Sequence, residues 1–294
     1  MLTIFLFLAY CIPRVNGGAN VLEYSNDPNG PSHWPGYCMT GTKQSPVNID
    51  QKDVVPVSLD DLVFTNYEKE GNIQIVNVGE TLQIRGFDSW GSNQPTISGG
   101  GLRYNYTLLQ IHFHWSDSDN HGSEHTFDGT HYPLEIHFVH TKENKTLQEA
   151  LLDPEGLMAL GIFGILSFDN YHFATITPGL EMLENTAPGT NISFTMAPER
   201  FFPPEKQVFY RYNGSLTTPN CDEVVIWTIL SAPIGININQ LSVMRAVRKA
   251  DHLDYSANVR SIQSLNGRVI QIREESNILE NHVSSKRYTI GVHY

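Results

Sequence analysis

The sequence predicts a mainly β (α+β) fold: a single domain built on a large, mostly antiparallel central sheet with short peripheral helices. Two observations carry this prediction. Between about residues 20 and 272, short apolar or alternating runs are separated by Gly, Pro, Asn and Asp, which is typical of strands joined by turns. No Pro/Gly/Ser-rich linker divides the 294 residues, and the 40% that are hydrophobic can form one large core.

The strand prediction is strongest where apolar and polar residues alternate and β-branched or aromatic side chains are frequent. These runs are residues 72–76, 81–85, 108–114 and 134–140. Helical signals are few, with short segments expected at residues 147–152 and 180–184. The clearest helix is predicted from Ile238 to Ala250, with Asn237 as its N-cap and Gln240 three residues later completing a capping box.

The first residues have the pattern of a secretory signal. Residues 2–12 are a mostly apolar run, too short to span a bilayer as a helix, and Gly17 and Gly18 mark a cleavage zone. The expected organisation is therefore a signal peptide at 1–17, one domain at 20–273 and a polar C-terminal tail at 274–294.

Cysteines, sequons and the C-terminus agree with secretion. Removal of the signal takes Cys11 away and leaves an even pair, Cys38 and Cys221, in an oxidising compartment. Residues 284–294 carry no hydrophobic tail, which speaks against a GPI anchor and a C-terminal transmembrane helix. We therefore expect a secreted, extracellular glycoprotein without a membrane anchor. The candidate glycosylation sites are the sequon residues Asn105, Asn144, Asn191 and Asn213.

The charge balance bears on partners. The chain has 19 Lys and Arg against 31 Asp and Glu, a formal net charge of −12. Phosphate binding needs clustered positive charge, so we expect no nucleic-acid partner. The same balance argues against a polybasic membrane-surface protein.

Histidines gather in one part of the chain, since seven of the twelve lie between residues 112 and 140. Residues two apart on a strand point to the same face, so Gln110, His112 and His114 share one side of the first predicted strand. Glu135 and His137 likewise share a side of the second. If the two strands pair antiparallel, the imidazoles of His112, His114 and His137 converge on one point. Three histidine ligands leave the fourth tetrahedral position open, as in a catalytic zinc site.

The residues beside these histidines fit the same interpretation. A ligating histidine needs an acceptor for its other ring N–H, and Gln110 and Glu135 each lie two residues before a ligand on the same face. The other histidines of the region differ in parity or lie in turn-like surroundings, and we interpret them as structural or solvent-facing. They are His121, His125, His131 and His140.

Taken with motifs elsewhere, this stretch resembles the active-site core of the α-class carbonic anhydrases, in particular the secreted type. The motifs are Gln44-Ser-Pro-Val-Asn-Ile-Asp, Gln110-Ile-His-Phe-His-Trp, Gly122-Ser-Glu-His, Leu134-Glu-Ile-His-Phe-Val-His, Leu160-Gly-Ile-Phe, Gly214-Ser-Leu-Thr-Thr-Pro, Asn258-Val-Arg and Leu265-Asn-Gly-Arg. They follow the family's order from about Tyr24 to Val269, so the resemblance covers most of the chain.

The resemblance implies a lyase, carbonate dehydratase, that reversibly hydrates CO2 to bicarbonate and a proton on a zinc-bound hydroxide. This enzyme class is the standard example of zinc lowering the pKa of a bound water to about 7. The cofactor would be Zn2+, held by His112, His114 and His137. Thr217 would accept a hydrogen bond from the hydroxide, and Glu124, an acceptor when ionised, would accept the threonine's proton in turn.

The resemblance also implies where CO2 and bicarbonate, the small-molecule partners, would bind. Thr218 takes a place beside Thr217 in the bicarbonate site. An apolar wall suits CO2, which has no net dipole. The residues that match this wall are Val139, Ala159, Leu216, Val225 and Trp227.

The two remaining cysteines match the disulfide of secreted members of the family. Cys221 lies four residues after Thr217, so a bridge to Cys38 would brace the loop that carries the threonine. The two cysteines are 183 positions apart, and chain entropy sets an upper bound of about 5 kcal/mol on the stabilisation, which native strain can reduce.

One position departs from the family in a way that bears on the rate. Fast members carry a proton-shuttle histidine in an Asn-x-Gly-His-Thr pattern, whereas this chain has Asn77-Val-Gly-Glu80-Thr. Glutamate ordinarily titrates near about 4.3 and histidine near about 6.5, so histidine is better matched to a donor near about 7. We expect a working enzyme whose proton transfer is slowed and depends on external buffer. A second departure, Leu22 in place of Trp two residues before Tyr24, concerns only N-terminal packing.

Two other hypotheses remain at this stage. A three-histidine site of another kind, such as a cupin, needs a glutamate ligand soon after His-x-His, and Glu124 lies ten residues past His114. A catalytically silent extracellular binding or matrix module on the same scaffold is the other, although silent relatives typically lose a zinc ligand. A CO2 hydration assay with and without a zinc chelator distinguishes them.

Overall fold

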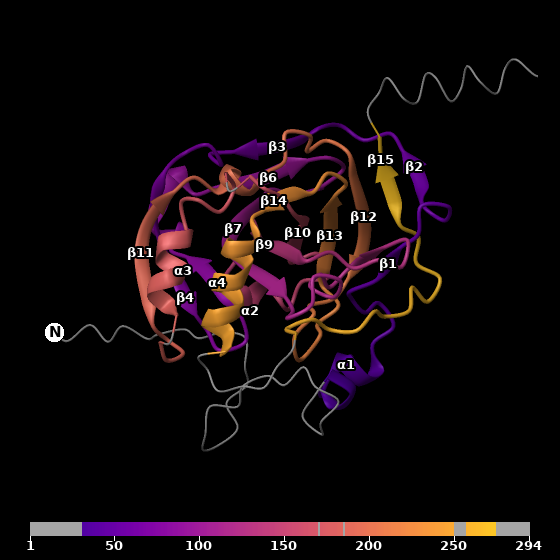
Figure 1. The fold of residues 1–294 in the computed structure, drawn as a ribbon. Helices are drawn as coiled ribbons and strands as arrows, with labels where there is room; N and C mark the ends of the chain where they lie inside the picture. The colour runs from indigo at the N-terminus through magenta and orange to yellow at the C-terminus, as the bar shows by residue number, and fades with distance from the viewer. Residues whose placement is uncertain (1–30, 170, 185, 250–256, 275–294) are drawn as a thin grey trace, which may run out of the picture.

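One large mixed β-sheet forms the body of the molecule (Figure 1). The computed structural model describes residues 31–169, 171–184, 186–249 and 257–274. The expected signal peptide at 1–17, Leu22, Tyr24 and residues 275–294 of the expected tail lie outside the described residues.

Thirteen strands make up the sheet, in the order β11-β4-β5-β7-β9-β10-β13-β12-β15-β2, with β14 paired to β10 and β6 paired to β3 and β7. Their bounds are β2 (Val55–Val57), β3 (Leu62–Thr65), β4 (Gly71–Asn77), β5 (Leu82–Arg85), β6 (Thr96–Gly99), β7 (Tyr106–Trp115), β9 (Leu134–Lys142), β10 (Leu157–Leu166), β11 (Asn191–Met196), β12 (Phe209–Gly214), β13 (Val225–Leu230), β14 (Ile234–Ile236) and β15 (Gln271–Arg273). β1 (Asn48–Ile49) and β8 (Thr126–Phe127) form a separate parallel pair.

Most neighbouring strands of the large sheet run antiparallel, as predicted. The parallel neighbours are β10 with β13, β10 with β14, and β15 with β2. The four runs with the clearest strand signal lie in β4, β5, β7 and β9. The mainly β, single-domain prediction is therefore confirmed, and its basis was the period-2 alternation that a pleated strand imposes.

The helices are short and peripheral. They are α1 (Tyr37–Thr40), α2 (Leu147–Ala150), α3 (Thr177–Leu183) and α4 (Ile238–Lys249), with 3-10 turns η1 (Pro31–His33), η2 (Phe87–Asn93) and η3 (Pro198–Phe201). α3 and α4 lie side by side over one face of the sheet (Figure 1). Within the described ranges, none of these helices is both long and apolar enough to cross a bilayer.

Capping contacts explain where two of these helices begin. At α4, Gln240 Oε1 accepts the N–H of Asn237 over 3.1 Å, which is one half of the predicted capping box, whereas Asn237 Oδ1 accepts the N–H of Asn239 over 2.9 Å in place of that of Gln240. The predicted end at Ala250 lies outside the described residues. α3 begins at Thr177, three residues before the predicted start, because Pro178 suits the first turn, where its missing N–H has no partner to lose.

The two faces of the central strands carry different side chains, apolar on one face and largely polar on the other. On β9, Ile136 and Phe138 point into the main apolar core, whereas the intervening Glu135, His137 and Val139 face the other way. All nine residues of β9 are buried, so even the polar face is shielded from bulk water. The sheet centre thus provides a rigid, buried platform for polar side chains.

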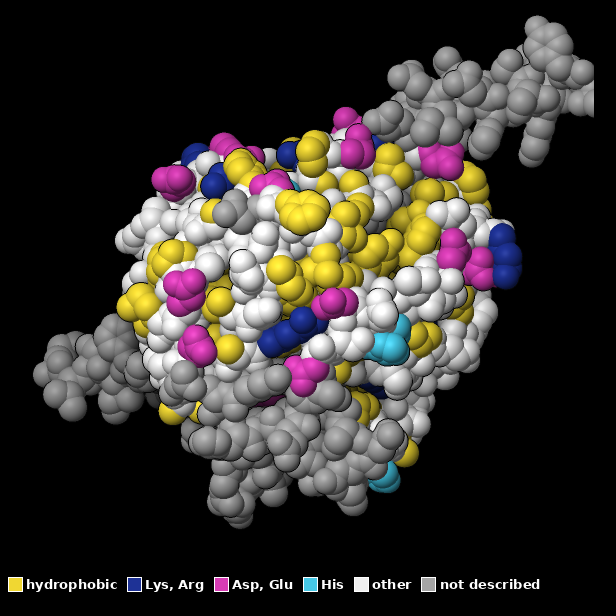
Figure 2. Space-filling model, in the orientation of Figure 1, with side chains coloured by type: hydrophobic (Ala, Val, Ile, Leu, Met, Phe, Trp, Pro, Cys, Tyr) yellow, Lys and Arg dark blue, Asp and Glu magenta, His cyan; other side chains and the backbone are white. Residues whose placement is uncertain are grey.

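On the surface drawn in Figure 2, the dark blue Lys and Arg side chains that the structure describes are scattered among acidic ones and gather into no extended basic area. Hydrophobic side chains show between them in broken groups. This distribution agrees with the acidic balance of the chain.

Candidate active site

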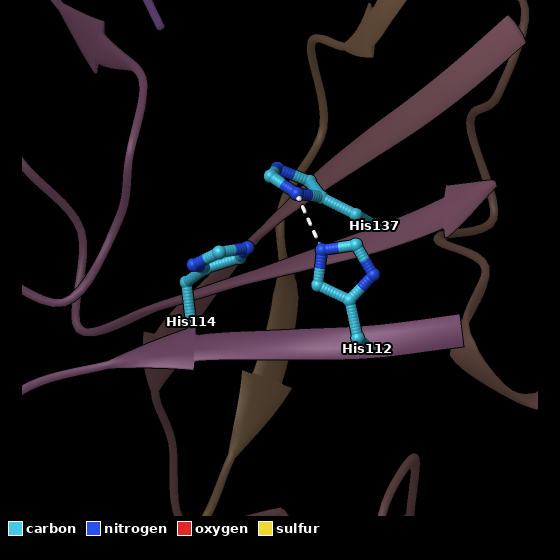
Figure 3. A group of neighbouring side chains, drawn as sticks. All are labelled: His112, His114 and His137. Atoms are coloured by element: carbon cyan, nitrogen blue, oxygen red, sulfur yellow. Dashed lines mark hydrogen bonds between the residues drawn. The ribbon is translucent and has the colours of Figure 1, made fainter. Parts of the chain in front are cut away.

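Three imidazoles meet on the polar face of the two central strands β7 and β9 (Figure 3). The strands run antiparallel, and His112 lies directly opposite His137 in the register. The ring centroid of His114 lies 4.9 Å from that of His112 and 4.5 Å from that of His137. The arrangement that the sequence predicts for these three side chains is therefore present in the fold.

A bulge in β7 produces this register. Leu108 pairs with His140 and Gln110 pairs with Val139, so Leu109 is an extra residue without a partner across the ladder. Without the bulge the pairing would be displaced by one residue, and His112 would face Ile136, whose side chain points to the opposite face.

Each of the three rings has one nitrogen held by an acceptor. Nδ1 of His112 donates to Gln110 Oε1 over 3.0 Å, and Nε2 of His137 donates to Glu135 Oε1 over 2.7 Å, the two partners expected from the sequence. Nδ1 of His114 donates to the backbone carbonyl of Asn258 over 2.7 Å. These acceptors fix the tautomers, so the remaining nitrogen of each ring offers a lone pair.

The donor set fits a metal ion. The free nitrogens of His112 and His137 are 3.2 Å apart, joined by the dashed line in Figure 3. Two nitrogens bound at 2.0–2.1 Å to one tetrahedral centre would lie about 3.3 Å apart. Nε2 of His114 is buried without a hydrogen bond, and so is Glu124 Oε2, 3.5 Å away. Buried acceptors that face one another are costly unless a cation or a donor lies with them, so these residues suit a zinc ion.

Burial favours the neutral form of two of these histidines, His112 and His114. It lowers the pKa of His112 well below its usual range, and repulsion from His114 and His137 lowers it further. Burial likewise lowers the pKa of His114, although Glu124 acts in the other direction. A neutral imidazole is the form that binds a metal.

Glu135 also contacts a second histidine. Its Oε1 accepts from His125 Nδ1 and from His137 Nε2, both over 2.7 Å, and His125 Nε2 contacts the Tyr212 hydroxyl at 2.6 Å. Burial of Glu135 raises its pKa, but the two histidines outweigh burial and hold the pKa well below its usual range. His125, Glu135 and His137 are close enough to hold a metal among themselves, but their ring nitrogens and carboxylate oxygen already form hydrogen bonds with one another. The candidate metal centre is therefore the group of His112, His114 and His137.

Gly161 on β10 makes room for this carboxylate. It lies opposite His137 in the ladder, and a Cβ there would come 2.5 Å from Ile229 Cδ1 and 3.2 Å from Glu135 Oε1. A side chain at this position would displace the acceptor that orients His137.

Thr217 and Glu124 lie close to the histidines, but the hydrogen bond expected between them is not formed. Thr217 lines the same cavity as the three histidines, while Glu124 is fully buried beside His114. Oε1 of Glu124 accepts the backbone N–H of Arg260 over 3.0 Å, and Oε2 has no hydrogen-bond partner. The carboxylate thus keeps one oxygen without a donor, 3.5 Å from His114 Nε2 and 3.9 Å from His137 Nδ1.

Two residues that position the site, Asn258 and Arg260, are part of a sequence motif, but no role was predicted for them from the sequence. Asn258 holds His114 through its carbonyl, and its side chain bonds the backbone of Trp115 and Phe113 on the same strand. Arg260 places Glu124 and also donates to Ser45 O over 2.7 Å. Asn258 is 144 residues from His114, so no local pattern reveals the contact.

The three histidines open on a cavity of about 550 Å3. Its apolar wall contains the five residues matched to the CO2 site together with two leucines: Val139, Leu147, Leu157, Ala159, Leu216, Val225 and Trp227. The polar side includes Glu80, Gln83, Arg85, Thr217 and Thr218. The cavity therefore combines an apolar side with a line of hydroxyl, amide and charged groups.

Comparison with known proteins agrees with this geometry. The model of eukaryotic-type carbonic anhydrases matches residues 29–274, most of the chain. The chain belongs to the eukaryotic-type carbonic anhydrase family. "Putative carbonic anhydrase 5" of Caenorhabditis elegans is 41% identical over 247 residues, 83% of this chain and 79% of that protein. "Putative carbonic anhydrase 3" of the same organism is 37% identical over 246 residues, 83% and 94% of the two chains. Carbonic anhydrase 15 of Mus musculus is 33% identical over 270 residues, 86% and 83%.

A carbonic anhydrase is a lyase, carbonate dehydratase, and the family in general depends on zinc. The α-class resemblance drawn from the sequence is thereby confirmed at the level of the family. The three histidines supply a place where this carbonic anhydrase could hold the metal.

Glu80, at the position of the family's shuttle histidine, lines the cavity and is half-buried. Gly79 precedes Glu80 in a tight turn and has a φ of 93°, a backbone conformation that glycine adopts easily. Its N–H donates to Asn77 Oδ1 over 2.9 Å. The carbonyl of Glu80 accepts from Asn258 Nδ2 over 3.0 Å. The backbone at residue 80 is therefore fixed by the same asparagine that holds His114.

The other histidines of the cluster lie away from the metal-binding nitrogens. His140 is fully buried, contacts the Tyr67 hydroxyl, and has its pKa lowered to about 4 by burial. His121 is exposed and stacks on the half-buried His131, with ring centroids 5.3 Å apart. His125 is buried in the network of Glu135 described above.

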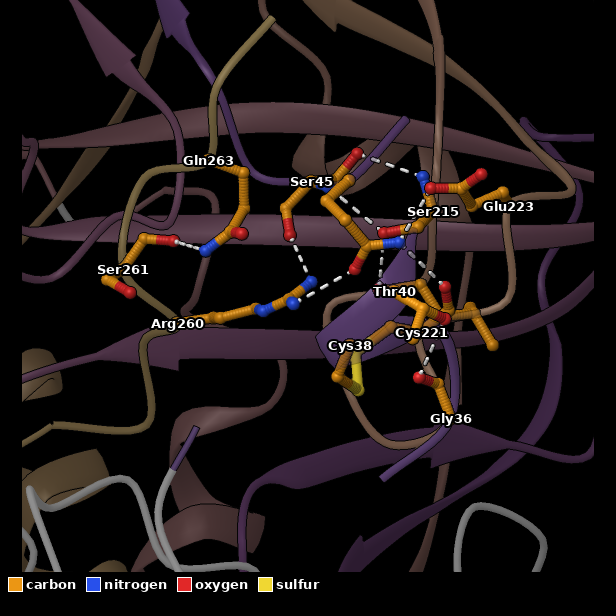
Figure 4. Close-up of a disulfide and its surroundings, with 12 residues drawn as sticks. Gly36, Cys38, Thr40, Ser45, Ser215, Cys221, Glu223, Arg260, Ser261 and Gln263 are labelled. Atoms are coloured by element: carbon orange, nitrogen blue, oxygen red, sulfur yellow. Dashed lines mark hydrogen bonds between the residues drawn. A yellow bond between two sulfur atoms is a disulfide. The ribbon is translucent and has the colours of Figure 1, made fainter. Parts of the chain in front are cut away.

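A disulfide links Cys38 of α1 to Cys221, with their Cα atoms 5.0 Å apart (Figure 4). The N–H of Cys221 donates to Thr218 O over 2.8 Å, and its carbonyl accepts from Gln44 Nε2 over 3.2 Å. Figure 4 shows Arg260 and Ser45 beside this bridge. The loop that carries Thr217 and Thr218 is thus fixed to the N-terminal part of the fold.

Removal of this bridge is expected to destabilise the protein strongly. In the double variant Cys38→Ser, Cys221→Ser the unfolded chain regains the entropy of a loop of 183 residues, so the free energy of unfolding should fall by up to about 5 kcal/mol. Chemical denaturation monitored by tryptophan fluorescence measures it. Met39→Ser, an exposed position on the same helix, is the matched control and should change little; equal stability of the two proteins would contradict the bracing role.

Proposed function

We propose that this carbonic anhydrase hydrates CO2 reversibly to bicarbonate and a proton with a zinc ion held by His112, His114 and His137. The observation that carries the proposal is the meeting of three imidazoles on one cavity, each with its second ring nitrogen fixed by an acceptor. When bound, zinc supplies a nucleophile at neutral pH by lowering the pKa of a bound water to about 7, for which this enzyme class is the standard example.

Thr217 and Glu124 orient the attacking oxygen in this proposal. The free Oε2 of Glu124 is buried and, as part of an ionised carboxylate, can only accept, so in the working site it would accept a hydrogen bond from the Thr217 hydroxyl, a bond that is not formed in the present structure. The threonine oxygen is then available to accept a hydrogen bond from the nucleophile. The pair thereby directs a lone pair of the attacking oxygen toward CO2 and disfavours anions that cannot donate a proton.

The apolar wall receives the substrate. Val139, Leu216 and Val225 line the cavity together with the metal-binding histidines and give CO2 a surface without competing hydrogen bonds. Thr218, next to Thr217 on the cavity lining, offers a hydroxyl to the bicarbonate product.

A stopped-flow CO2 hydration assay tests the proposal. The zinc-loaded protein should hydrate CO2, should lose this activity when a chelator removes the metal, and should regain it when zinc is added. Absent or chelator-insensitive activity would favour a catalytically silent binding module on the same scaffold. The presence of all three histidines with free lone pairs supports the enzyme.

Proton transfer is the step in which this chain is expected to differ from fast members of the family. Glu80 lines the cavity at the shuttle position, and an ordinary glutamate is more acidic than the donor it would serve. Glu80→His should raise the maximal hydration rate in weak buffer. The gain should vanish in concentrated imidazole buffer, which carries protons itself.

Two comparisons complete this test. Glu80→Gln, which cannot titrate, should leave the rate near that of the natural protein if Glu80 contributes little. An unchanged rate of Glu80→His in weak buffer would remove the proposed limitation. Zinc content measured on each protein checks that a difference in rate does not come from a difference in metal loading.

We also propose that the protein is secreted, with a signal at 1–17, one domain at 20–273 and a polar tail at 274–294. Support comes from the disulfide, which is favoured in an oxidising compartment, and from the exposure of all four sequon asparagines. Expression of the full chain in secreting eukaryotic cells, with sequencing of the N-terminus of the protein in the medium, tests the localisation and the cleavage site.

A further inference from the structure

One of the four sequon asparagines lies at the active-site cavity. Asn105, Asn144, Asn191 and Asn213 are all exposed, but of these only Asn144 lines the cavity that contains the three histidines. A modification at the other three would stand on the outer surface of the domain. A modification at Asn144 would stand where ligands enter.

Asn144 sits at the tip of a tight turn between β9 and α2. The N–H of Lys145 donates to the carbonyl of Lys142 over 2.9 Å, and the two central residues, Glu143 and Asn144, have φ of 50° and 60°. This left-handed conformation at both central residues is that of a type I′ turn, which asparagine tolerates better than most residues. The turn places the exposed Asn144 at the rim of the cavity.

A hydrogen bond from Thr107, the threonine of the Asn105 sequon, holds the Asn144 side chain in place. The hydroxyl of the buried Thr107 donates to Asn144 Oδ1 over 2.6 Å. Among the described residues, no hydrogen bond engages Nδ2 of Asn144. The amide oxygen is therefore fixed toward the protein, and the amide nitrogen, which is the atom that receives a glycan, is left available.

We propose that Asn144 carries an N-linked glycan that stands at the rim of the cavity and restricts the entry of bulky ligands while CO2 and bicarbonate pass. The proposal rests on passage through the secretory pathway, proposed above. In the transfer, a bond forms between Nδ2 and C1 of the first sugar, the C1–O bond to a lipid-linked pyrophosphate donor breaks, and Nδ2 loses one proton. No oxidant or reductant is required.

The modification preserves the local contacts. A glycosylated asparagine keeps its carbonyl oxygen, so the hydrogen bond from Thr107 survives. Lys145, the next residue, is held by an ion pair with Asp153 at 2.5 Å, and Thr146, the sequon threonine, caps α2 by accepting the N–H of Glu149. The glycan is thus attached to a fixed turn, and its bulk stays at the cavity mouth.

The experiment uses the full chain secreted from eukaryotic cells and loaded with zinc. Glycopeptide mass spectrometry measures occupancy at each sequon. Access to the cavity is then measured as the rate of zinc removal by two probes that share a pyridine-dicarboxylate head, one free and one attached to a polyethylene glycol chain of several kilodaltons. Asn144→Gln is compared with the matched control Asn213→Gln, which removes an exposed sequon away from the cavity.

We expect Asn144 to be occupied and Asn144→Gln to speed zinc removal by the bulky probe several-fold, with no change for the free head and none in Asn213→Gln. Trimming the natural glycoprotein enzymatically to a single sugar should give the same rise without altering any residue, so the test stands even if the variant folds poorly.

The outcomes separate this inference from the proposed function. Occupied sequons elsewhere with an unmodified Asn144, or an occupied Asn144 whose removal leaves both probes unchanged, would overturn the inference alone. A protein that stays inside the cell with no sequon occupied would overturn the proposed secretion and the inference with it, while CO2 hydration remains a separate measurement.

Discussion

Replacement of one imidazole, His112→Ala, is expected to abolish CO2 hydration because it removes one of the three proposed protein ligands to zinc. Loss of a residue that merely orients a ligand costs about 10- to 100-fold in metal affinity, so loss of the ligand itself should cost more than about 100-fold. His112 is the best of the three to replace, because its partner Gln110 is half-buried and can turn to water. Zinc content after dialysis and stopped-flow hydration measure the two effects.

His121→Ala is the matched control, since His121 is exposed and its ring stacks on His131 away from the cavity. It should keep one zinc ion and full activity. Thermal unfolding of the metal-free proteins checks that His112→Ala still folds. If His112→Ala retained stoichiometric zinc and normal hydration, the metal centre would have to lie elsewhere.

The second large effect is expected at Thr217. Thr217→Val keeps the shape of the side chain and removes the hydroxyl that is proposed to orient the attacking oxygen. Misplacement of a reacting group costs about 10²-fold, and we expect a loss of this order in kcat/KM with zinc content unchanged. Thr217→Ser retains the hydroxyl and should recover most of the rate.

Glu124→Gln tests the same chain of contacts from its other end. The glutamine oxygen can still accept the N–H of Arg260, while an NH2 group replaces the free Oε2, so the acceptor proposed for the Thr217 hydroxyl is lost. The loss should resemble that of Thr217→Val, and the double variant should lose little more. Additive losses, or a normal rate in Thr217→Val, would contradict a shared role.

Much of the fold and part of the site could be predicted from local pattern. The strands of the sheet core were found because alternation has a period of two, and the contact between Asn237 and Gln240 at the start of α4 because these residues are three apart. The same period placed Gln110 beside His112 and Glu135 beside His137, and both hydrogen bonds are present. These contacts join residues two positions apart, where strand geometry alone decides proximity.

Other contacts of the site depend on the path of the whole chain. Asn258 fixes His114, and Arg260 fixes Glu124 across 136 residues, and neither contact has a signal in the neighbouring sequence. The bulge at Leu109, which brings His112 opposite His137, is equally invisible, because one extra residue in a ladder leaves the local alternation nearly unchanged. The expected bond between Thr217 and Glu124 joins two distant segments, and it is not formed in the structure.

By itself, therefore, the sequence determined the fold class, the face on which the histidines lie and, through its motifs, the family. The tertiary structure alone decided which nitrogen of each ring is free, which acceptors hold the others, and that Asn144 stands at the cavity while three other sequons do not. The physical reason is that local periodicity fixes only the side of a strand to which a residue points. The register between strands and the closure of distant segments over them fix what that residue meets.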